Sequence, residues 1–374
     1  MPVPDVHIRA ITGGSDLHRF VTFPWRIYRD DPYWVPPLIG DTKKMLTPGK
    51  HPFHEHGEVA LWMAYRDGEP VGRIAGIVNR AHNEFQGEQT AFFGFFDSID
   101  DPLVSGALLE TAARWAKERG MLTLRGPANF STNEECAMLV DGFDSSPCVM
   151  MPYNPAYYPA LLEKAGFAKA KDLVAYLLRD EGVPERLLRL SEEIRRRENV
   201  EIRSLDKKRF GEEVDRFSKV YNQAWERNWG FVPMTEHEIA HMAKELKAAV
   251  DPEMILFLEK EGEPIGFAMA LPDLNQALRH ANGRLFPFGL LKILYHARKI
   301  HKVRVLILGI LEAHRGRGLD VLLYLQLFKN GTRRGYHEGE FSWILEDNVA
   351  IRRPLERIGA KVYKTYRFYE RPLA

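Results

Sequence analysis

The stretch that decides the fold is residues 305–330, VLILGILEAHRGRGLDVLLYLQLFKN. Its first seven residues form a nearly continuous apolar run, the pattern of a strand that is covered on both faces. Its second half carries apolar residues at helical spacing from Leu319 to Phe328. Between them lies the basic sequence Arg315-Gly316-Arg317-Gly318. The stretch therefore predicts a buried strand, a tight loop and a helix.

A loop of this kind is suited to a phosphate or pyrophosphate group. A chain that turns through glycines into a helix directs several backbone N–H groups at one point, and the helix dipole adds to them. A Walker loop would need Gly-Lys-Ser/Thr, which is missing, and a dinucleotide fingerprint would need a third glycine where Val321 stands. A glycine turn that only caps a helix is the alternative interpretation.

The loop resembles motif A of the GNAT superfamily of acyl-CoA N-acyltransferases, Arg/Gln-x-x-Gly-x-Gly/Ala. An aspartate takes the place of the motif's last small residue. The resemblance implies that this loop holds the CoA pyrophosphate, and that a main-chain N–H on the preceding strand polarises the thioester carbonyl. The implied CoA-binding residues are Leu308, Gly309, Ile310, Arg315, Gly316, Arg317, Gly318, Leu319 and Asp320.

A second motif follows at the expected distance. Asn348 begins a predicted helix that Gly359 closes, and the preceding residues 335–344 indicate a turn and a strand. This segment is similar to GNAT motif B, in which the Asn lies beside the pantetheine arm, so Asn348 joins the implied CoA site. Family members often carry a Tyr seven residues past the Asn as general acid. Leu355 occupies that position.

Composition narrows the class of protein. A chain of 374 residues is too long for one ordinary core, and its 45% hydrophobic content is that of a globular protein. A formal net charge of +1 argues against a broad nucleic-acid surface. Two cysteines form neither a disulfide framework nor a zinc site, and no signal peptide or membrane span is recognised, so we expect a cytoplasmic protein without a bound metal.

Two halves of the chain repeat each other. GEPVG at 68–72 recurs as GEPIG at 262–266, an offset of 194, and apolar strands flank both turns, which predicts two β-hairpins. Asn154 recurs as Asn348 at the same offset. The repeat predicts two copies of one fold, and the resemblance above implies what that fold is: an α/β (α+β) fold of two tandem acyl-CoA N-acyltransferase-like domains, each a mixed, mostly antiparallel twisted sheet flanked by helices. Their predicted bounds are 1–180 and 199–374, joined by a solvated linker helix at 181–198.

The first copy lacks the loop of the second. At the equivalent place it has SIDDPLVSG, residues 98–106, in which two aspartates stand where a phosphate would lie. We expect this degenerate copy not to bind CoA in the usual way. His51, His54 and His56 have no matching carboxylate or cysteine set, so they do not predict a metal site.

Candidate catalytic and acceptor residues come from the second copy. The general base is sought among Glu346, Asp273 and Glu312, and the general acid among the tyrosines of the last strand, where we select Tyr363. In the GNAT fold the first helix and the following loop line the acceptor site. The resemblance therefore implies acceptor contacts from Trp225, Asn228 and Trp229.

An insertion precedes the motif-A strand, and its residues 286–302 are amphipathic and basic. We interpret it as a helix packed on the neighbouring copy, as a lid, or as a peripheral membrane contact.

The predicted function is transfer of an acyl group from acetyl-CoA or another acyl-CoA to a small or amphiphilic amine. A degenerate GNAT-like protein that binds CoA or another ligand is an alternative, which Leu355 and Asp320 favour. A Fem-type aminoacyl transferase using charged tRNA is a third, against which the near-neutral charge argues.

Overall fold

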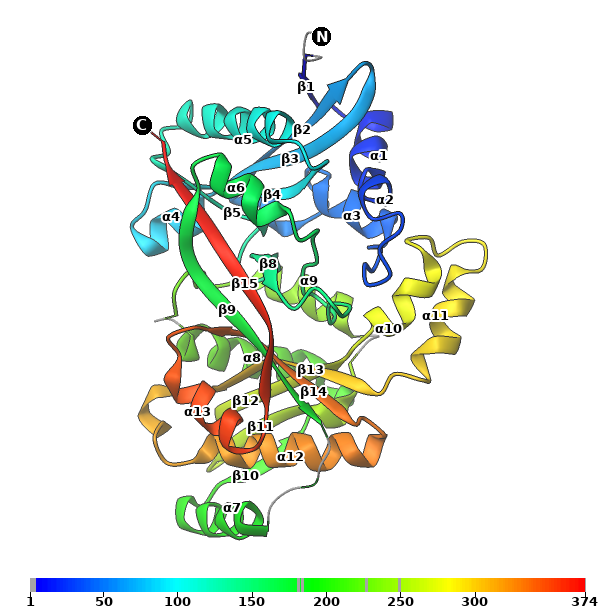
Figure 1. The fold of residues 1–374 in the computed structure, drawn as a ribbon. Helices are drawn as coiled ribbons and strands as arrows, with labels where there is room; N and C mark the ends of the chain where they lie inside the picture. The colour runs from blue at the N-terminus through cyan, green and yellow to red at the C-terminus, as the bar shows by residue number, and fades with distance from the viewer. Residues whose placement is uncertain (1–4, 180–181, 183–184, 226–227, 248–249, 374) are drawn as a thin grey trace. The chain divides into compact units, whose positions relative to one another are not determined.

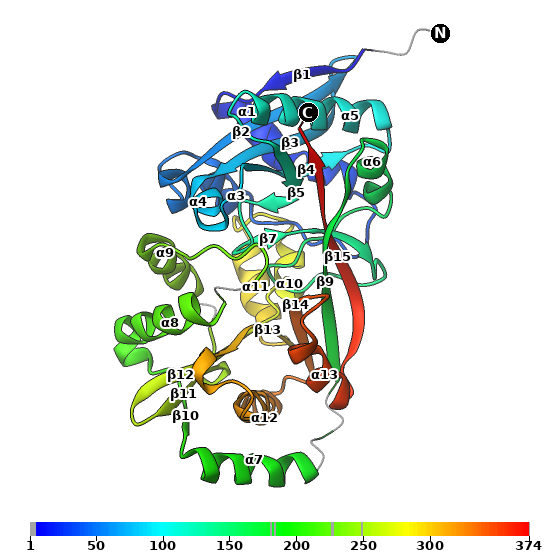
Figure 2. The same ribbon diagram turned by 90° about the vertical axis from the view of Figure 1, so that its left-hand side faces the viewer.

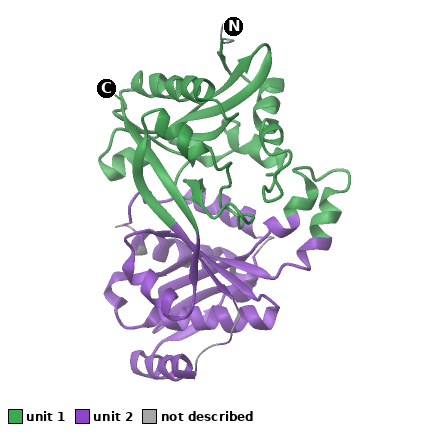
Figure 3. Cartoon of the chain, viewed as in Figure 1, with its two compact units in different colours: residues 1–173, 278–294, 364–374 green, residues 174–277, 295–363 purple. Residues whose placement is uncertain are grey.

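The computed structural model describes residues 5–179, 182, 185–225, 228–247 and 250–373. These residues form two compact units, which Figure 3 colours separately. Unit 1 comprises residues 1–173, 278–294 and 364–374, and unit 2 comprises residues 174–277 and 295–363. The units are groupings by proximity, so the predicted boundaries of the repeat at 180 and 199 stay a prediction.

Unit 1 contains a mixed sheet in the order β1-β2-β3-β4-β5-β15, and β8 pairs with β15 (Figure 1). All the registered pairs in it are antiparallel except β4 with β5. Its strands are β1 (His7–Ala10), β2 (Gly57–Arg66), β3 (Glu69–Asn79), β4 (Thr90–Ser98), β5 (Thr123–Gly126) and β8 (Met138–Asp141), with a small β6 (Ala128–Asn129) and β7 (Glu135–Cys136) ribbon. Its helices are α1 (Gly14–Thr22), α2 (Pro24–Ile27), α3 (Ile39–Leu46), α4 (Arg80–Gln86), α5 (Pro102–Lys117) and α6 (Tyr158–Lys164).

Unit 2 repeats this plan with the order β9-β14-β13-β12-β11-β10. Helix α8 covers one face of its sheet, and α12 and α13 cover the other (Figure 2). Its strands are β10 (Glu201–Ser204), β11 (Ile255–Lys260), β12 (Glu263–Pro272), β13 (Lys302–Ile310) and β14 (Glu338–Leu345). Its helices are α7 (Glu185–Glu198), α8 (Phe210–Ala224), α9 (Glu236–Leu246), α10 (Asn275–Leu278), α12 (Leu319–Arg334) and α13 (Val349–Arg357).

The two sequence copies also share details of backbone structure, namely a β-hairpin with a register shift at the same place. Both predicted hairpins are confirmed, as β2 with β3 and as β11 with β12. The register of the first shifts between Ala64 and Tyr65, and that of the second between Leu258 and Glu259. Both shifts therefore stand at the offset of 194 that relates the two sequences. A conserved offset in a β-bulge shows that the copies share strand geometry as well as residue pattern.

Two long strands contribute residues to both units. β9 (Ala168–Arg179) passes from unit 1 to unit 2 after Leu173, and β15 (Lys361–Pro372) passes from unit 2 to unit 1 after Tyr363. In unit 1 the end of β15 pairs with β5, with Tyr369 opposite Gly126. The last strand of the second sequence copy thus completes the sheet of the first. The repeat in the sequence gave no indication of this exchange.

Candidate active site

Strands β13 and β14 diverge in the middle of the unit 2 sheet. Their parallel register extends from Lys302 opposite Glu338 to Val305 opposite Phe341. Beyond that pair β13 continues to Ile310 and β14 to Leu345, without a further registered pair in the described part of the chain. Parallel strands that separate leave backbone N–H and C=O groups of both strands for another partner. We call this place the β13–β14 divergence.

A bulge in β13 lies at the start of the divergence. Opposite β12, Met269 pairs with Ile307 and Ala270 pairs with Val305, so Leu306 is an extra residue in the ladder. Such a bulge leaves one residue outside the regular hydrogen-bonding pattern and turns the strand locally. Sequence reasoning placed the thioester-facing residues at Leu308, Gly309 and Ile310 and did not identify Leu306, because a single inserted residue leaves an apolar run unchanged.

The loop after β13 has the backbone of an anion site. Gly316 and Gly318 have φ values of +75° and +80°, a region that residues with a side chain avoid. Residues 315–317 are exposed. Within the described residues, the N–H groups of Gly316, Arg317 and Gly318 have no hydrogen-bond acceptor. Helix α12 begins directly after them at Leu319, as predicted, so its positive end lies beside these donors.

The two arginines of the loop already have partners inside the protein. Arg315 donates through Nε to the carbonyl of Ile310 at 3.0 Å. Arg317 forms an ion pair with Glu198 at 3.2 Å and donates to the carbonyl of Ala313 at 3.3 Å. The free donors of the loop are therefore its peptide nitrogens. The sequence-based assignment of charge from Arg315 and Arg317 to a pyrophosphate stays a prediction.

Helix α7 packs beside this loop and α12 (Figure 2). Ile194 is only 3% exposed, and its side chain lies against Gly318. Arg197 donates to the carbonyl of Arg317 at 2.8 Å. The prediction of a solvated linker helix does not hold at Ile194, although most of α7 is exposed. One isoleucine among many charged residues gave too weak a signal of burial.

Asp320 departs from the family motif in a specific way. The neighbouring N–H groups of Asp320 and Val321 lower the pKa of its carboxyl, but burial is the larger effect and raises the pKa. The Val321 N–H donates to the carbonyl of Gly318 at 3.2 Å. The half-buried carboxyl therefore stands in the first turn of α12, next to the donors of residues 316–318.

Several predicted residues come together at the carboxyl ends of β13 and β14. Asn348 caps α13 by accepting from the N–H of Ile351 at 3.3 Å, so its predicted role as the start of a helix is confirmed. Glu346 follows β14 directly, and its backbone carbonyl accepts from Arg352 at 2.5 Å. Because parallel strands end at the same edge of a sheet, Glu346, Asn348 and loop 315–318 share one edge.

Two predicted catalytic residues lie at the other end of β13. The N–H of Asp273 donates to the carbonyl of Lys302 at 2.9 Å. The ammonium of Lys302 lies 5.5 Å from the centre of the Tyr363 ring, and the Tyr363 hydroxyl donates to Glu340. At about 3.3 Å per residue, Lys302 and Ile310 are roughly 26 Å apart. The structure therefore does not bring Asp273 and Tyr363 to the edge that carries loop 315–318.

The predicted acceptor residues lie at the end of α8. The Trp225 ring packs on Gly309 of β13, where a Cβ would come within 2.3 Å of it, and it stacks on Tyr221 with ring centres 5.2 Å apart. Asn228 donates its N–H to the carbonyl of Trp225 at 2.8 Å, and Trp229 is half-buried. Trp225 is thus placed on the strand that also carries the predicted thioester-facing residues.

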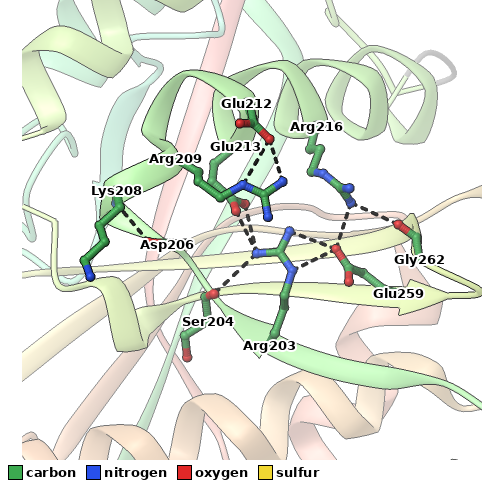
Figure 4. A network of polar contacts seen from close by, with 10 residues as sticks. All are labelled: Arg203, Ser204, Asp206, Lys208, Arg209, Glu212, Glu213, Arg216, Glu259 and Gly262. Atoms are coloured by element: carbon green, nitrogen blue, oxygen red, sulfur yellow. Dashed lines mark hydrogen bonds and ion pairs between the residues drawn. The ribbon is translucent and has the colours of Figure 1, made fainter.

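An ionic network joins α8, the helix that precedes Trp225, to the sheet (Figure 4). Arg203 of β10 contacts Glu213 of α8 and Glu259 of β11, each at 2.8 Å. Glu213 is 2% exposed. Arg216 also contacts Glu259, at 2.9 Å. A buried carboxylate needs such partners, and together they tie the helix to two strands.

A cavity of about 1060 Å³ lies in unit 2 beside the divergence. Val305 and Phe341 line it, and they are also the last registered pair of β13 and β14. On these two strands the cavity extends from that last pair along the paired segment, where Val303, Glu338 and Gly339 also line it.

The other lining residues of the cavity are mainly apolar and come from β9, α7, α12, α13 and β15; they include Leu187, Tyr324, Leu325, Phe328, Ile358 and Tyr363. Four basic side chains and one acidic side chain also line it: Arg179, Arg186, Arg357, Lys361 and Glu338.

Within the ranges that the structure describes, no cluster of three His, Cys, Asp or Glu side chains could hold a metal ion. No helix among those residues has the length and hydrophobicity to cross a bilayer.

Comparison with solved structures identifies this fold. The chain matches a tandem GNAT protein from the clavulanic acid biosynthesis pathway with a TM-score of 0.57 at 12% identity, covering 99% of both chains. The protein therefore has the tandem GNAT fold, with two mixed, mostly antiparallel sheets flanked by helices. The predicted fold class and the resemblance to the GNAT superfamily are confirmed at this level. No family model matches the chain.

Two curated relatives match nearly the whole chain. "Protein YghO" of Escherichia coli (strain K12) is 37% identical over 374 residues, covering 98% of this chain and 95% of the relative. The "Bacterial ceramide synthase" of Caulobacter vibrioides is 35% identical over 379 residues, covering 99% of this chain and 98% of the relative. The chain belongs to the family that includes these two proteins.

Proposed function

We propose that the protein is an acyl-CoA-dependent N-acyltransferase that joins a long-chain acyl group to the amine of a long-chain amino alcohol. The observation that carries the proposal is the β13–β14 divergence beside a loop whose peptide N–H groups at 316–318 lack acceptors. Diverging strands receive an extended ligand arm, and the loop receives an anion at one end of it. A CoA thioester has both parts.

The substrate class is supported by the relative and by the cavity. One relative is named a bacterial ceramide synthase, and a ceramide is the amide of a fatty acid with a long-chain amino alcohol. The cavity of about 1060 Å³ slightly exceeds the usual range of ligand pockets, about 300–1,000 Å³. Because Val305 and Phe341 lie both at the divergence and in the cavity wall, an acyl chain attached to a thioester there would enter it.

The reaction forms one bond and breaks one. The neutral amine attacks the thioester carbonyl, the C–N bond forms and the C–S bond breaks, and the amine proton ends on the CoA thiol. In this proposal a backbone N–H at the bulge around Leu306 stabilises the oxyanion, and the irregular register there supports that assignment. Glu346, at the same sheet edge as the loop, is our candidate for accepting the amine proton through water. The catalytic roles predicted for Asp273 and Tyr363 form no part of this proposal.

The first experiment measures CoA binding by calorimetry and amide formation by mass spectrometry. The full chain would be given acetyl-, octanoyl- or palmitoyl-CoA with a sphingoid base, and we expect most product from palmitoyl-CoA. Gly318→Val should weaken CoA binding at least about tenfold, because valine disfavours φ +80° and its Cβ would meet Ile194 at 2.8 Å. Gly120→Val is the matched control, since its φ is +75° in unit 1 and nothing lies near its Cβ.

The outcomes separate the candidate functions. CoA binding that is equal in the two variants would refute the loop assignment. CoA binding without product from any acyl length would favour a ligand-binding protein. Leu325→Trp, which narrows the cavity, should shift the preferred donor from palmitoyl- toward octanoyl-CoA. An unchanged chain-length preference would remove the cavity from the proposal.

A further inference from the structure

The segment around helix α11 (Gly289–Ala297) exposes an unusual amount of apolar surface. Fourteen large hydrophobic side chains are exposed in the described part of the chain, and seven of them lie between residues 285 and 295. Phe286 is 87% exposed. Exposed hydrophobic residues scattered singly are ordinary, whereas a contiguous group marks an interaction site. We call residues 285–295 the apolar tip.

Helix α11 in the apolar tip exposes its apolar side chains to solvent. A helix on a protein surface normally buries its apolar stripe and exposes its polar one. In α11 the exposed positions include Leu290, Leu291, Leu294 and Tyr295, which lie on adjacent turns, while Gly289 is buried. Phe286 and Phe288 precede the helix and are exposed as well. The apolar side chains therefore project from the fold and do not enter its core.

The base of the segment is held firmly in unit 1. Trp25 donates through Nε1 to the side chain of Asn282 at 2.7 Å, and its ring packs against Gly283. Ile39 donates its N–H to the carbonyl of Gly283 at 3.0 Å, and Arg279 donates to the carbonyl of Pro32 at 2.7 Å. The tip is thus presented from an ordered base. These contacts agree with packing on the first copy for residues 279–283, but they leave 285–295 uncovered.

The charge around the tip has one sign. Residues 274–311 contain seven Lys and Arg residues and no Asp or Glu, in a chain whose net charge is +1. Three of these cations, Lys292, Arg298 and Lys299, are exposed on or directly after α11. A protein partner of mixed charge does not require a stretch of 38 residues without an acid. An anionic lipid surface favours such a stretch, because exposed carboxylates near it would be repelled and exposed Lys and Arg residues attracted.

We propose that the apolar tip docks this protein on the surface of an anionic lipid bilayer. The side chains of Phe286, Phe288, Leu290, Leu291, Leu294 and Tyr295 enter the boundary between headgroups and acyl chains, and the neighbouring cations contact lipid phosphates. The inference rests on the surface alone and does not require the proposed acyl transfer. It agrees with that function, because long-chain substrates reside in membranes.

The test is flotation of the full chain with vesicles. Binding should be strong to phosphatidylglycerol-containing vesicles at low salt, and at least about tenfold weaker to pure phosphatidylcholine or at 0.5 M salt. Phe286→Ser with Phe288→Ser should reduce binding at least about tenfold. The matched control is Leu103→Ser with Leu122→Ser, which removes two exposed leucines elsewhere in unit 1 and should leave binding unchanged.

A second pair of variants isolates the charge, and a second measurement isolates self-association. Lys292→Glu with Arg298→Glu should abolish the preference for anionic vesicles while the apolar residues remain. Sedimentation without lipid should give the same mass for the wild type and the Phe286/Phe288 variant. A mass that falls in the variant would show that the tip joins two copies of the chain. That result, or equal binding of all variants to vesicles, would overturn the proposal.

Discussion

The two copies differ most at one equivalent place. It is the passage from β4 to α5 in unit 1 and from β13 to α12 in unit 2. In unit 1 the bulged strand β4 donates the N–H of Phe95 to Asn129 at 2.8 Å, and the next helix is capped by Asp101, which accepts from Leu103 at 2.8 Å. In unit 2 the equivalent loop leaves the N–H groups of residues 316–318 without an acceptor. In the described part of the chain, unit 1 satisfies the Phe95 and Leu103 donors with its own side chains, whereas the three loop donors of unit 2 have no acceptor from the protein.

The strand partners show the same contrast. A Cβ on Gly94 of β4 would come within 2.1 Å of the carbonyl of Ala128, so protein backbone fills the space beside that strand. At Gly309 of β13 the neighbour is the Trp225 side chain, at 2.3 Å. A side chain can move aside at low cost, whereas a packed backbone cannot. The space beside the glycine is therefore filled by backbone in unit 1 and by a side chain in unit 2.

The largest loss of stability that we expect comes from the buried carboxylates that pair with arginine, Asp97 in unit 1 and Glu213 in unit 2. Asp97 in unit 1 is 4% exposed and accepts from Arg73 at 2.7 Å, Tyr28 at 3.0 Å and Tyr158 at 3.1 Å. Asp97→Ala should lower the free energy of unfolding by about 3–5 kcal/mol, because three buried donors lose their acceptor. Urea unfolding followed by circular dichroism would measure it.

Two variants calibrate this measurement. Glu213→Gln in unit 2 should cost less, about 1–3 kcal/mol, because its partner Arg203 is partly solvated and keeps Glu259. Asp16→Asn removes an exposed ion pair with Arg19 and should cost less than about 1 kcal/mol. If Glu213→Gln proved more damaging than Asp97→Ala, unit 1 would not be the more rigid copy.

A smaller loss of stability should follow when the hydrogen bond between Phe95 and Asn129 in unit 1 is removed. Asn129→Ala removes the acceptor of the Phe95 N–H, so we expect a loss of about 1–3 kcal/mol in the free energy of unfolding. CoA affinity, measured by calorimetry, should stay that of the wild type, because the proposed CoA loop is in unit 2. A change in CoA affinity would contradict the assignment of the binding function to one copy.

The smallest effect concerns Asp320. Burial raises the pKa of this carboxyl in the folded chain, so its contribution to stability is present below its unfolded pKa and is lost as pH rises through its folded pKa. Asp320→Asn should remove that decline, which begins near the ordinary carboxyl pKa of about 4; urea unfolding at a series of pH values would measure it. It should also tighten CoA binding a few-fold, because no carboxylate then repels an anion at the start of α12. Weaker CoA binding would show that the side chain assists the ligand.

Much of the fold could be predicted because the repeated residues have strong preferences for particular local structures, such as turns, strands and helix ends. The two GEP-containing turns and the apolar run before Gly309 identified strands, and Asn348 with Gly359 gave both ends of α13. The glycine loop could be located for the same reason. What these signals share is that they act within a few residues of chain.

The rest depends on contacts between distant residues. The bulge at Leu306 exists only in relation to β12, and the burial of Ile194 exists only because α7 lies on α12. Asp273 and Tyr363 were selected for chemistry, and only the strand register shows that they lie at the far end of β13. Candidate acids and bases can be selected from a sequence, but their distance from the proposed CoA loop is known only from the structure.

The crossing of β15 into unit 1 has a consequence for how the protein is made. The residues that pair with β5 are Tyr369–Pro372 of β15, which follow the whole second copy in the sequence. During synthesis the first copy emerges from the ribosome early, yet its sheet edge at β5 stays uncovered until these residues have been made. The amino-terminal copy is therefore synthesised first but completes its sheet only after the second copy has been translated.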